Sequence, residues 1–236
     1  MDSGVELVQE TISGEGHCLE WLPAITSRPI LPLETELFCA ELPHVRAAVR
    51  RCWAEGSPLA AIAAMPEREG CDDRLGTALR VESVEDLPDG SLRVRAVGLW
   101  PFKVLAAAVR VARSADAGDA QAVLVNYVQA IRLDDCDRTS GLDPKAAALR
   151  EEVVRSVVLA GTRGLFAMQS DADFSWSVAA RLPLPPAARG VFLHLRSAKE
   201  RLSVCHQVLV ASLGPFGGAQ EGGCAYISPE SPRSRL

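Results

Sequence analysis

The sequence predicts an α+β fold in which the strands come first and the helices follow. Residues 75–105 have the pattern of a β-hairpin, and apolar residues at helical spacing dominate only after residue 143. Between these halves, residues 133–142 are polar and rich in aspartate, as expected of a linker. This segregation favours an α+β domain or two subdomains over an alternating βαβ arrangement.

The hairpin is the clearest local signal. Apolar Leu92, Val94 and Ala96 alternate with Arg93 and Arg95, which is typical of a strand with one buried and one exposed face. The turn is expected at 88–90, Pro-Asp-Gly, because glycine accepts a positive φ without steric cost. Gly98 is expected to end this strand, and a further strand begins at Phe102.

The rest of the first half is predicted from composition and spacing. Residues 1–27 show no strong periodicity and are interpreted as an N-terminal extension. Residues 28–33 contain two prolines, which suit an edge strand and exclude a helix. Further elements are a helix over 42–54 and strands over 59–65, 102–112 and 122–130, so that 28–132 form a β-rich subdomain.

The second half, residues 143–214, is predicted to be a helical subdomain. Asp143 and Pro144 form a good N-cap and first position for a helix to about residue 161. Asp173 is expected to cap a second helix, and a short third helix follows Pro186. Ser197 and Glu200 have the spacing of a capping box for the last helix. The glycine-, serine- and proline-rich residues 215–236 predict a disordered tail.

Composition restricts the function classes. The net charge of −5 and pI near 5.5 argue against nucleic acid as a partner. The seven cysteines contain no C-x-x-C pair, so neither a zinc site nor a disulfide framework is predicted. No apolar run is long enough to span a membrane, and the acidic N-terminus resembles no targeting signal. We therefore expect a cytoplasmic protein.

No catalytic constellation, metal site or cofactor is predicted. The sequence lacks the P-loop pattern that binds ATP. Lys199 lies near Ser197 and Ser203, but this segment is explained by its capping box. The pairs His17-Cys18 and Cys205-His206 are adjacent in sequence, and neighbouring side chains on a helix point in different directions.

Four aromatic residues have two possible roles. Most such side chains belong to a core, and the alternative is an exposed apolar patch that binds unfolded polypeptide. Trp100, between Gly98 and Pro101, is the best candidate for partial exposure. The candidate polypeptide-binding residues are Phe38, Trp53, Trp100 and Phe102.

Three stretches together resemble the Lon N-terminal domain family, the substrate-binding module of Lon proteases, which also occurs in RING-finger proteins and as stand-alone bacterial proteins. Residues 31–38 (LPLETELF) look like its opening strand, and 75–105 look like its "GT … DG … G-x-x-RF-x-vL" core, with Pro101 in place of the arginine. Residues 173–184 and 197–202 look like its helical half. The segment after Phe38 is shorter than in the family and lacks the family's tyrosine.

The resemblance implies a PUA-like β-barrel or folded sheet followed by a C-terminal helical bundle. It also implies a non-catalytic module that recognises exposed apolar segments of unfolded or client polypeptides. The first alternative is an adaptor that recruits clients to a separate protease or ubiquitin ligase. The second, from fold analogy alone, is RNA binding.

Overall fold

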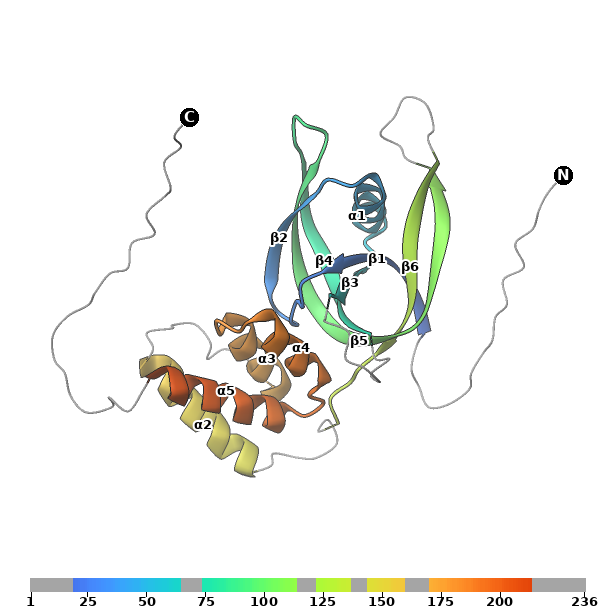
Figure 1. Cartoon of the computed structure of the whole chain (residues 1–236). Helices are drawn as coiled ribbons and strands as arrows, with labels where there is room; N and C mark the ends of the chain where they lie inside the picture. Colours follow the sequence, from blue (N-terminus) through green and yellow to red (C-terminus); the bar gives the residue numbers. More distant parts are fainter. Residues whose placement is uncertain (1–18, 65–73, 114–121, 137–143, 160–169, 214–236) are drawn as a thin grey trace, which may run out of the picture.

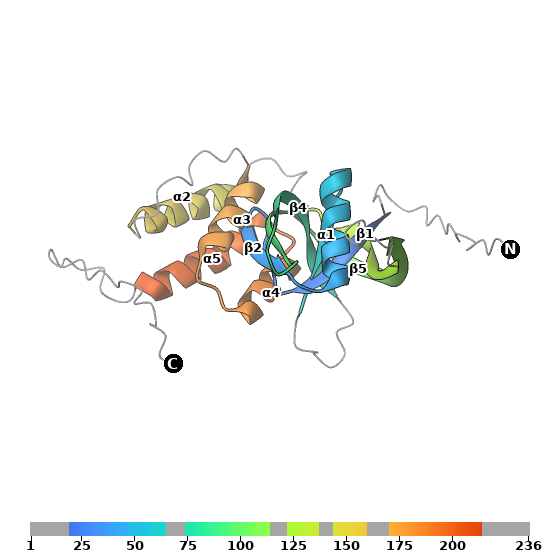
Figure 2. The ribbon, with the colours of Figure 1, turned by 90° about the horizontal axis from the view of Figure 1, so that it is seen from above.

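The structure is a computed structural model that describes residues 19–64, 74–113, 122–136, 144–159 and 170–213. A curved β-rich half lies beside a cluster of helices, as Figures 1 and 2 show from two directions. The expected tail over 215–236 lies outside the described residues. The α+β class predicted from the sequence is confirmed.

Most of the β-rich half is one sheet that closes on itself. The strand order is β2-β5-β4-β3-β1-β6, and β5 also pairs with β6. Strands β5, β4, β3, β1 and β6 therefore form a ring, as expected of a PUA-like barrel, while β2 lies outside the ring at the side of β5. The strands are β1 (Leu19–Ser27), β2 (Thr35–Ala40), β3 (Leu59–Ala63), β4 (Leu75–Asp86), β5 (Leu92–Arg113) and β6 (Ala122–Arg132).

The predicted hairpin is formed by β4 and β5. Leu92, Val94 and Ala96 are fully buried, whereas Arg93 and Arg95 are exposed, so the alternation predicted from the sequence is confirmed. The prediction that Gly98 ends the strand is wrong, because β5 continues through it for 22 residues. A Cβ at Gly98 would lie 2.3 Å from the carbonyl oxygen of Leu31. Glycine is therefore needed here for close backbone approach and not for a break.

Two expectations near the N-terminus are wrong. The end of the expected extension over 1–27 is β1, a central strand that pairs parallel with β3 and antiparallel with β6. Leu22, Ala24 and Ile25 in β1 are buried, and Pro23 between them hides the alternation. Residues 28–33 form no strand, and the edge strand begins only at Thr35. Pro29 instead follows a bend at Arg28, and Pro32 lies in a turn.

The sheet has an apolar cluster on each face. Helix α1 (Pro43–Glu55) covers one face, where Ala48, Val49 and Cys52 pack against residues from all six strands. Residues that alternate with those contacts point to the opposite face and form the second cluster. Its members are Leu22, Ala24, Ala60, Ala78, Phe102, Val128 and Ala130.

The helical half contains α2 (Pro144–Leu159), α3 (Asp171–Arg181), α4 (Pro186–His194) and α5 (Ala198–Leu213). Ser170, and not Asp173 as expected, caps α3, and its hydroxyl accepts a hydrogen bond from the Asp173 amide. The serine half of the predicted capping box is confirmed, because the Glu200 amide donates to Ser197 Oγ at 3.4 Å. None of the described helices is long and apolar enough to cross a lipid bilayer.

Residues 133–136 are more than a linker. Arg201 on α5 is fully buried, and its guanidinium donates to both carboxylate oxygens of Asp135, at 2.6 and 2.8 Å. The same guanidinium lies 4.1 Å from the centre of the Trp176 ring. Leu31 and Leu75 from the β-rich half belong to the core of the helical half. The core of the helical half therefore includes residues from both halves.

Substitution of Gly98 by alanine is expected to lower the free energy of unfolding by roughly 2–3 kcal/mol, since the new methyl group must push the backbone of Leu31 away. The control is Gly56→Ala. Gly56 has a φ of 63°, and nothing lies within 4 Å of its Cβ position, so only backbone strain of about 1 kcal/mol is expected. Urea unfolding of both variants checks this. A smaller effect at Gly98 than at Gly56 would contradict the close approach.

Candidate polypeptide-binding surface

A tight turn precedes the edge strand β2. The Glu34 amide donates to the Leu31 carbonyl at 3.2 Å, and the Leu33 amide donates to the Gly98 carbonyl at 2.8 Å. Leu33 has a φ of 64°, and it is the one non-glycine residue with positive φ in the part of the chain that the structure describes. Such a conformation costs a leucine about 1–2 kcal/mol. Its side chain is nevertheless 38% exposed, so burial does not explain the choice of leucine.

Glu34 fixes this turn from beneath. Its carboxylate accepts the Leu31 amide at 2.9 Å and Arg28 Nη2 at 3.0 Å. Arg189 Nη1, from helix α4, lies 2.7 and 2.6 Å from the two carboxylate oxygens. Glu34 and Arg189 are both buried, at 7% and 9% exposure. One carboxylate therefore ties the turn to its own backbone and to the helical half.

Strand β2 presents a row of side chains to solvent. Thr35, Leu37 and Cys39 are exposed, whereas Phe38 and Ala40 point to the face that α1 covers. Leu37 is 68% exposed, which is unusual for a leucine at the centre of a strand. Since β2 pairs with β5 alone among the described strands, its outer edge is open. An open edge beside an exposed apolar side chain is a typical place for another chain to bind.

Charged side chains from β5 and β4 lie beside this row. Arg95 pairs in register with Leu37, and Arg93 pairs with Cys39. Arg93 Nη1 lies 2.9 Å from Glu85 Oε2 on β4. Glu82 forms ion pairs with two arginines. Its oxygens lie 3.2 Å from Arg95 Nε and 3.3 Å from Arg80 Nη2. Three arginines and two glutamates therefore border the exposed row of β2.

Two of the candidate residues from the sequence lie together, but not at this surface. Trp100 and Phe102 form an edge-to-face pair with ring centres 6.2 Å apart. Phe102 is completely buried in the second sheet cluster, where it supports the strands and offers no surface to a ligand. Trp100 is partly buried at the margin of the same cluster, and the Arg132 guanidinium lies 5.7 Å from its ring centre.

The other two candidates belong to different elements. Phe38, on β2, is half-buried and packs under α1. Trp53, near the end of α1, is 49% exposed. Leu42, at the beginning of the same helix, is 57% exposed. Of the four aromatic residues, Trp53 thus presents the largest exposed fraction for contact with another chain.

Leu33 and Leu37 were not identified from the sequence. The segment LPLETELF has leucines at positions 31, 33 and 37, and the sequence does not indicate which of them is buried. A positive φ at a leucine has no sequence signal, since glycine or asparagine is the usual marker. The one available signal for Leu37 was its spacing from Thr35 and Cys39, the alternation of a strand with a polar face.

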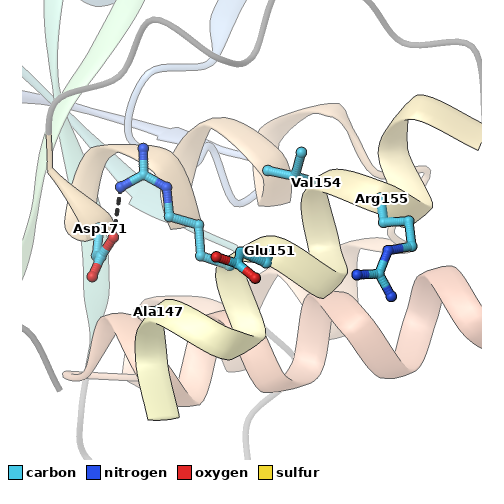
Figure 3. Close-up of a pocket in the computed structure, with 6 residues that line it drawn as sticks. Ala147, Glu151, Val154, Arg155 and Asp171 are labelled. Carbon is cyan, nitrogen blue, oxygen red and sulfur yellow. Dashed lines mark hydrogen bonds and ion pairs between the residues drawn. The ribbon is translucent and has the colours of Figure 1, made fainter. Parts of the chain in front are cut away.

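A hollow of about 570 Å³ lies beside α2 and the beginning of α3 (Figure 3). Its lining carries two arginines, Arg150 and Arg155, and two carboxylates, Glu151 and Asp171, so its charges balance. Arg150 Nη1 is held by Asp171 at 2.7 Å, and its guanidinium lies 4.8 Å from the centre of the Phe174 ring. This hollow is thus bordered by an internal ion pair, and we do not assign a ligand to it.

No group of three or more metal-ligating side chains occurs among residues the structure describes. Of the cysteines in those ranges, Cys39 and Cys136 are exposed. Burial raises the pKa of the Cys52 thiol to about 11 and that of Cys205 to about 12. A thiol with such a pKa is a poor nucleophile at neutral pH, so both behave as small apolar core residues.

In the native protein at pH 8, the thiol of Cys39 is expected to react with iodoacetamide at least tenfold faster than the thiols of Cys52 and Cys205. The thiolate fraction of the two buried cysteines is small, and their sulfur atoms are out of reach of the reagent. Peptide mass spectrometry of the alkylated protein measures each site. Urea should equalise the rates, and rapid labelling of Cys205 without urea would contradict the packing of α5.

Replacement of Arg189 by alanine is expected to lower the free energy of unfolding by about 3 kcal/mol, because it leaves the buried Glu34 carboxylate without its main partner. The control is Arg93→Ala, which removes an exposed pair with Glu85 and is expected to cost less than about 1 kcal/mol. Urea unfolding compares the two. Equal effects would show that Arg189 does not hold the turn.

Comparison with known proteins agrees with the sequence resemblance at the level of fold. No protein-family model and no curated protein matches the chain. Among solved structures, a Lon N-terminal domain protein from Xanthomonas campestris superposes with a TM-score of 0.55 at 22% identity, over 78% of this chain and 96% of that one. The N-terminal domain of Mycobacterium avium complex Lon protease gives 0.58 at 14% identity, over 80% and 98%. The chain therefore has the fold of Lon N-terminal domains.

Proposed function

We propose that this chain is a non-catalytic module that binds polypeptide segments with exposed apolar side chains. The observation that carries the proposal is the exposure of Leu37, at 68%, on an open edge strand within a Lon N-terminal domain fold. The family that the sequence resembles uses this fold to bind substrates. The partner class is therefore unfolded or client polypeptide.

Binding is expected to come from burial of a few apolar side chains. Leu33 and Leu37 offer one contact area, while Leu42 and Trp53 on α1 offer another. Each buried side chain of this size contributes about 1.5–3 kcal/mol before the entropy of ordering is subtracted. Small areas of this kind support weak affinity, which suits a module that releases its client.

The contact area on β2 is rigid before a client arrives. Glu34 holds the turn through Arg28, Arg189 and the Leu31 amide, so Leu33 and Leu37 are already in place. A surface that needs no ordering loses less entropy on binding. This supports β2 and its turn as the primary contact, with α1 as a secondary one.

The test compares an unfolded protein with its native form, for example reduced and alkylated lysozyme against native lysozyme. We expect at least tenfold tighter binding of the unfolded form, measured by fluorescence anisotropy. Leu37→Ala and Trp53→Ala should each weaken it about three- to tenfold, in line with the loss of one partly buried side chain.

The matched control is Val111→Ala, because Val111 is also 68% exposed but lies on β5 far along the chain from β2. This variant should bind the unfolded protein as the wild type does. Equal affinity for native and unfolded lysozyme would contradict the proposed function. A single stoichiometric protein captured from a lysate, in place of many clients, would favour the adaptor alternative.

A further inference from the structure

We propose that the open edge of β2 binds an extended polypeptide segment as an added β-strand, and that the preferred segment carries acidic residues two positions before and after an apolar residue, so that all three lie on one face. This inference rests on the proposed function and specifies its binding mode and substrate class. It combines three independent features of the edge: the direction of its backbone groups, its exposed side chains and its bordering charge.

The backbone direction follows from the ladder between β2 and β5. The Gly98 amide donates to the Glu34 carbonyl at 2.9 Å, so Glu34 faces β5. In an antiparallel pair, residues that bond to the neighbouring strand recur at every second position. Glu36, Phe38 and Ala40 therefore bond to β5. The amides and carbonyls of Thr35, Leu37 and Cys39 point to the open edge, where an extended chain can pair with them.

The side chains of the same three residues form the exposed face. Leu37 lies in the middle, with Thr35 and Cys39 on either side. A residue that pairs with Leu37 across the new ladder would have its side chain on the same face, in contact with it. The strand thus supplies hydrogen bonds for affinity and one apolar contact for selectivity.

The length of the site is limited by the turn. The amides of Leu33 and Glu34 are already bonded to the Gly98 and Leu31 carbonyls, so pairing cannot extend in that direction. The open edge therefore covers residues 35–39, which is about 17 Å of strand. A segment of five to seven residues fills it.

The charge next to the edge selects the segment. On the exposed face of β5 and β4, the partners of Arg80, Arg93 and Arg95 among the described carboxylates are Glu82 and Glu85, and Arg80 and Arg95 share Glu82. The three arginine side chains are 55–62% exposed. This face is locally positive in a chain with a net charge of −5. An acidic residue two positions from the residue that pairs with Leu37 would lie on this same face and complete the pairing, whereas a lysine there would be repelled.

The first test is residue-resolved hydrogen exchange with two synthetic nonapeptides that have a central valine and threonine at most other positions. The Val/Glu peptide has glutamate two positions before and after the valine, and the Val/Lys peptide has lysine at the same two positions. In the free protein, the amides of Leu37 and Cys39 should exchange quickly and those of Glu36 and Phe38 slowly. Saturating Val/Glu peptide should slow Leu37 and Cys39 at least tenfold and leave the other two unchanged. The Val/Lys peptide should bind at least fivefold more weakly at low salt.

The second test separates the backbone from the side chain at one position. Leu37→Pro removes the edge-facing amide without removing a bond to β5, since proline is tolerated on an edge strand. Leu37→Ala keeps the amide and removes the side chain. The proline variant should bind the Val/Glu peptide at least fivefold more weakly than the alanine variant. In the Leu37→Pro variant, slow exchange of the Phe38 amide would show that β2 is intact. If that variant disrupts β2, Cys39→Pro provides a second substitution at an edge-facing amide.

The outcomes distinguish this inference from the proposed function. If unfolded lysozyme binds but Leu37→Pro and Leu37→Ala bind equally and the alternating protection is absent, strand addition is wrong and polypeptide binding stands. If neither the peptides nor unfolded lysozyme bind, both proposals fail. If sedimentation shows a dimer that Leu37→Pro abolishes and the peptide does not compete with it, the edge serves self-association and the inference is overturned.

Discussion

Buried guanidinium–carboxylate contacts hold the parts of this fold together. Arg189 on α4 reaches Glu34 in the turn before β2, and Arg201 on α5 reaches Asp135 after β6. Both arginines come from the helical half, and both carboxylates belong to the segments that enter or leave the sheet. A charge buried at these positions is tolerated only with its partner in place, so the helices are tied to one orientation against the sheet.

This constraint explains how an energetically unfavourable turn persists at the surface. A leucine at positive φ would relax if the turn were free. Two hydrogen bonds prevent this, because the Glu34 carboxylate accepts the Leu31 amide and the Gly98 carbonyl accepts the Leu33 amide. The strain is balanced by bonds that lie below the surface. The result is a short edge strand whose direction, exposed side chain and backbone groups are fixed by the core and independent of any ligand.

The parts of the fold that could be predicted from the sequence are those with a local pattern. The alternation around Leu92–Ala96 gave the hairpin, and Pro144 and Ser197 marked the beginnings of helices. The errors arose where a long-range contact decides the structure. From the sequence, Gly98 is expected to end a strand. In the structure the strand continues through it, and glycine is needed because the Leu31 carbonyl lies too close for a Cβ. Pro23 masks β1, which is held by its neighbours on both sides.

The candidate site was harder to predict from the sequence, again because long-range contacts decide which side chains are exposed. Phe102 and Trp100 are conspicuous by size, but Phe102 supports the sheet from within. Leu37 is inconspicuous, because its exposure depends on β2 being outermost in the strand order. Burial of Arg201 was also not predicted, since an arginine is expected at the surface unless its carboxylate partner is known.

The ring of strands also determines when the protein can assemble. β1 pairs with β6, although about a hundred residues separate them along the chain. During synthesis, β1 therefore emerges from the ribosome long before the strand that completes the ring, and its apolar residues stay without their final neighbours until residue 132 is available. Nascent chains of this protein thus pass through a stage in which they resemble the unfolded polypeptides that the finished domain is proposed to bind.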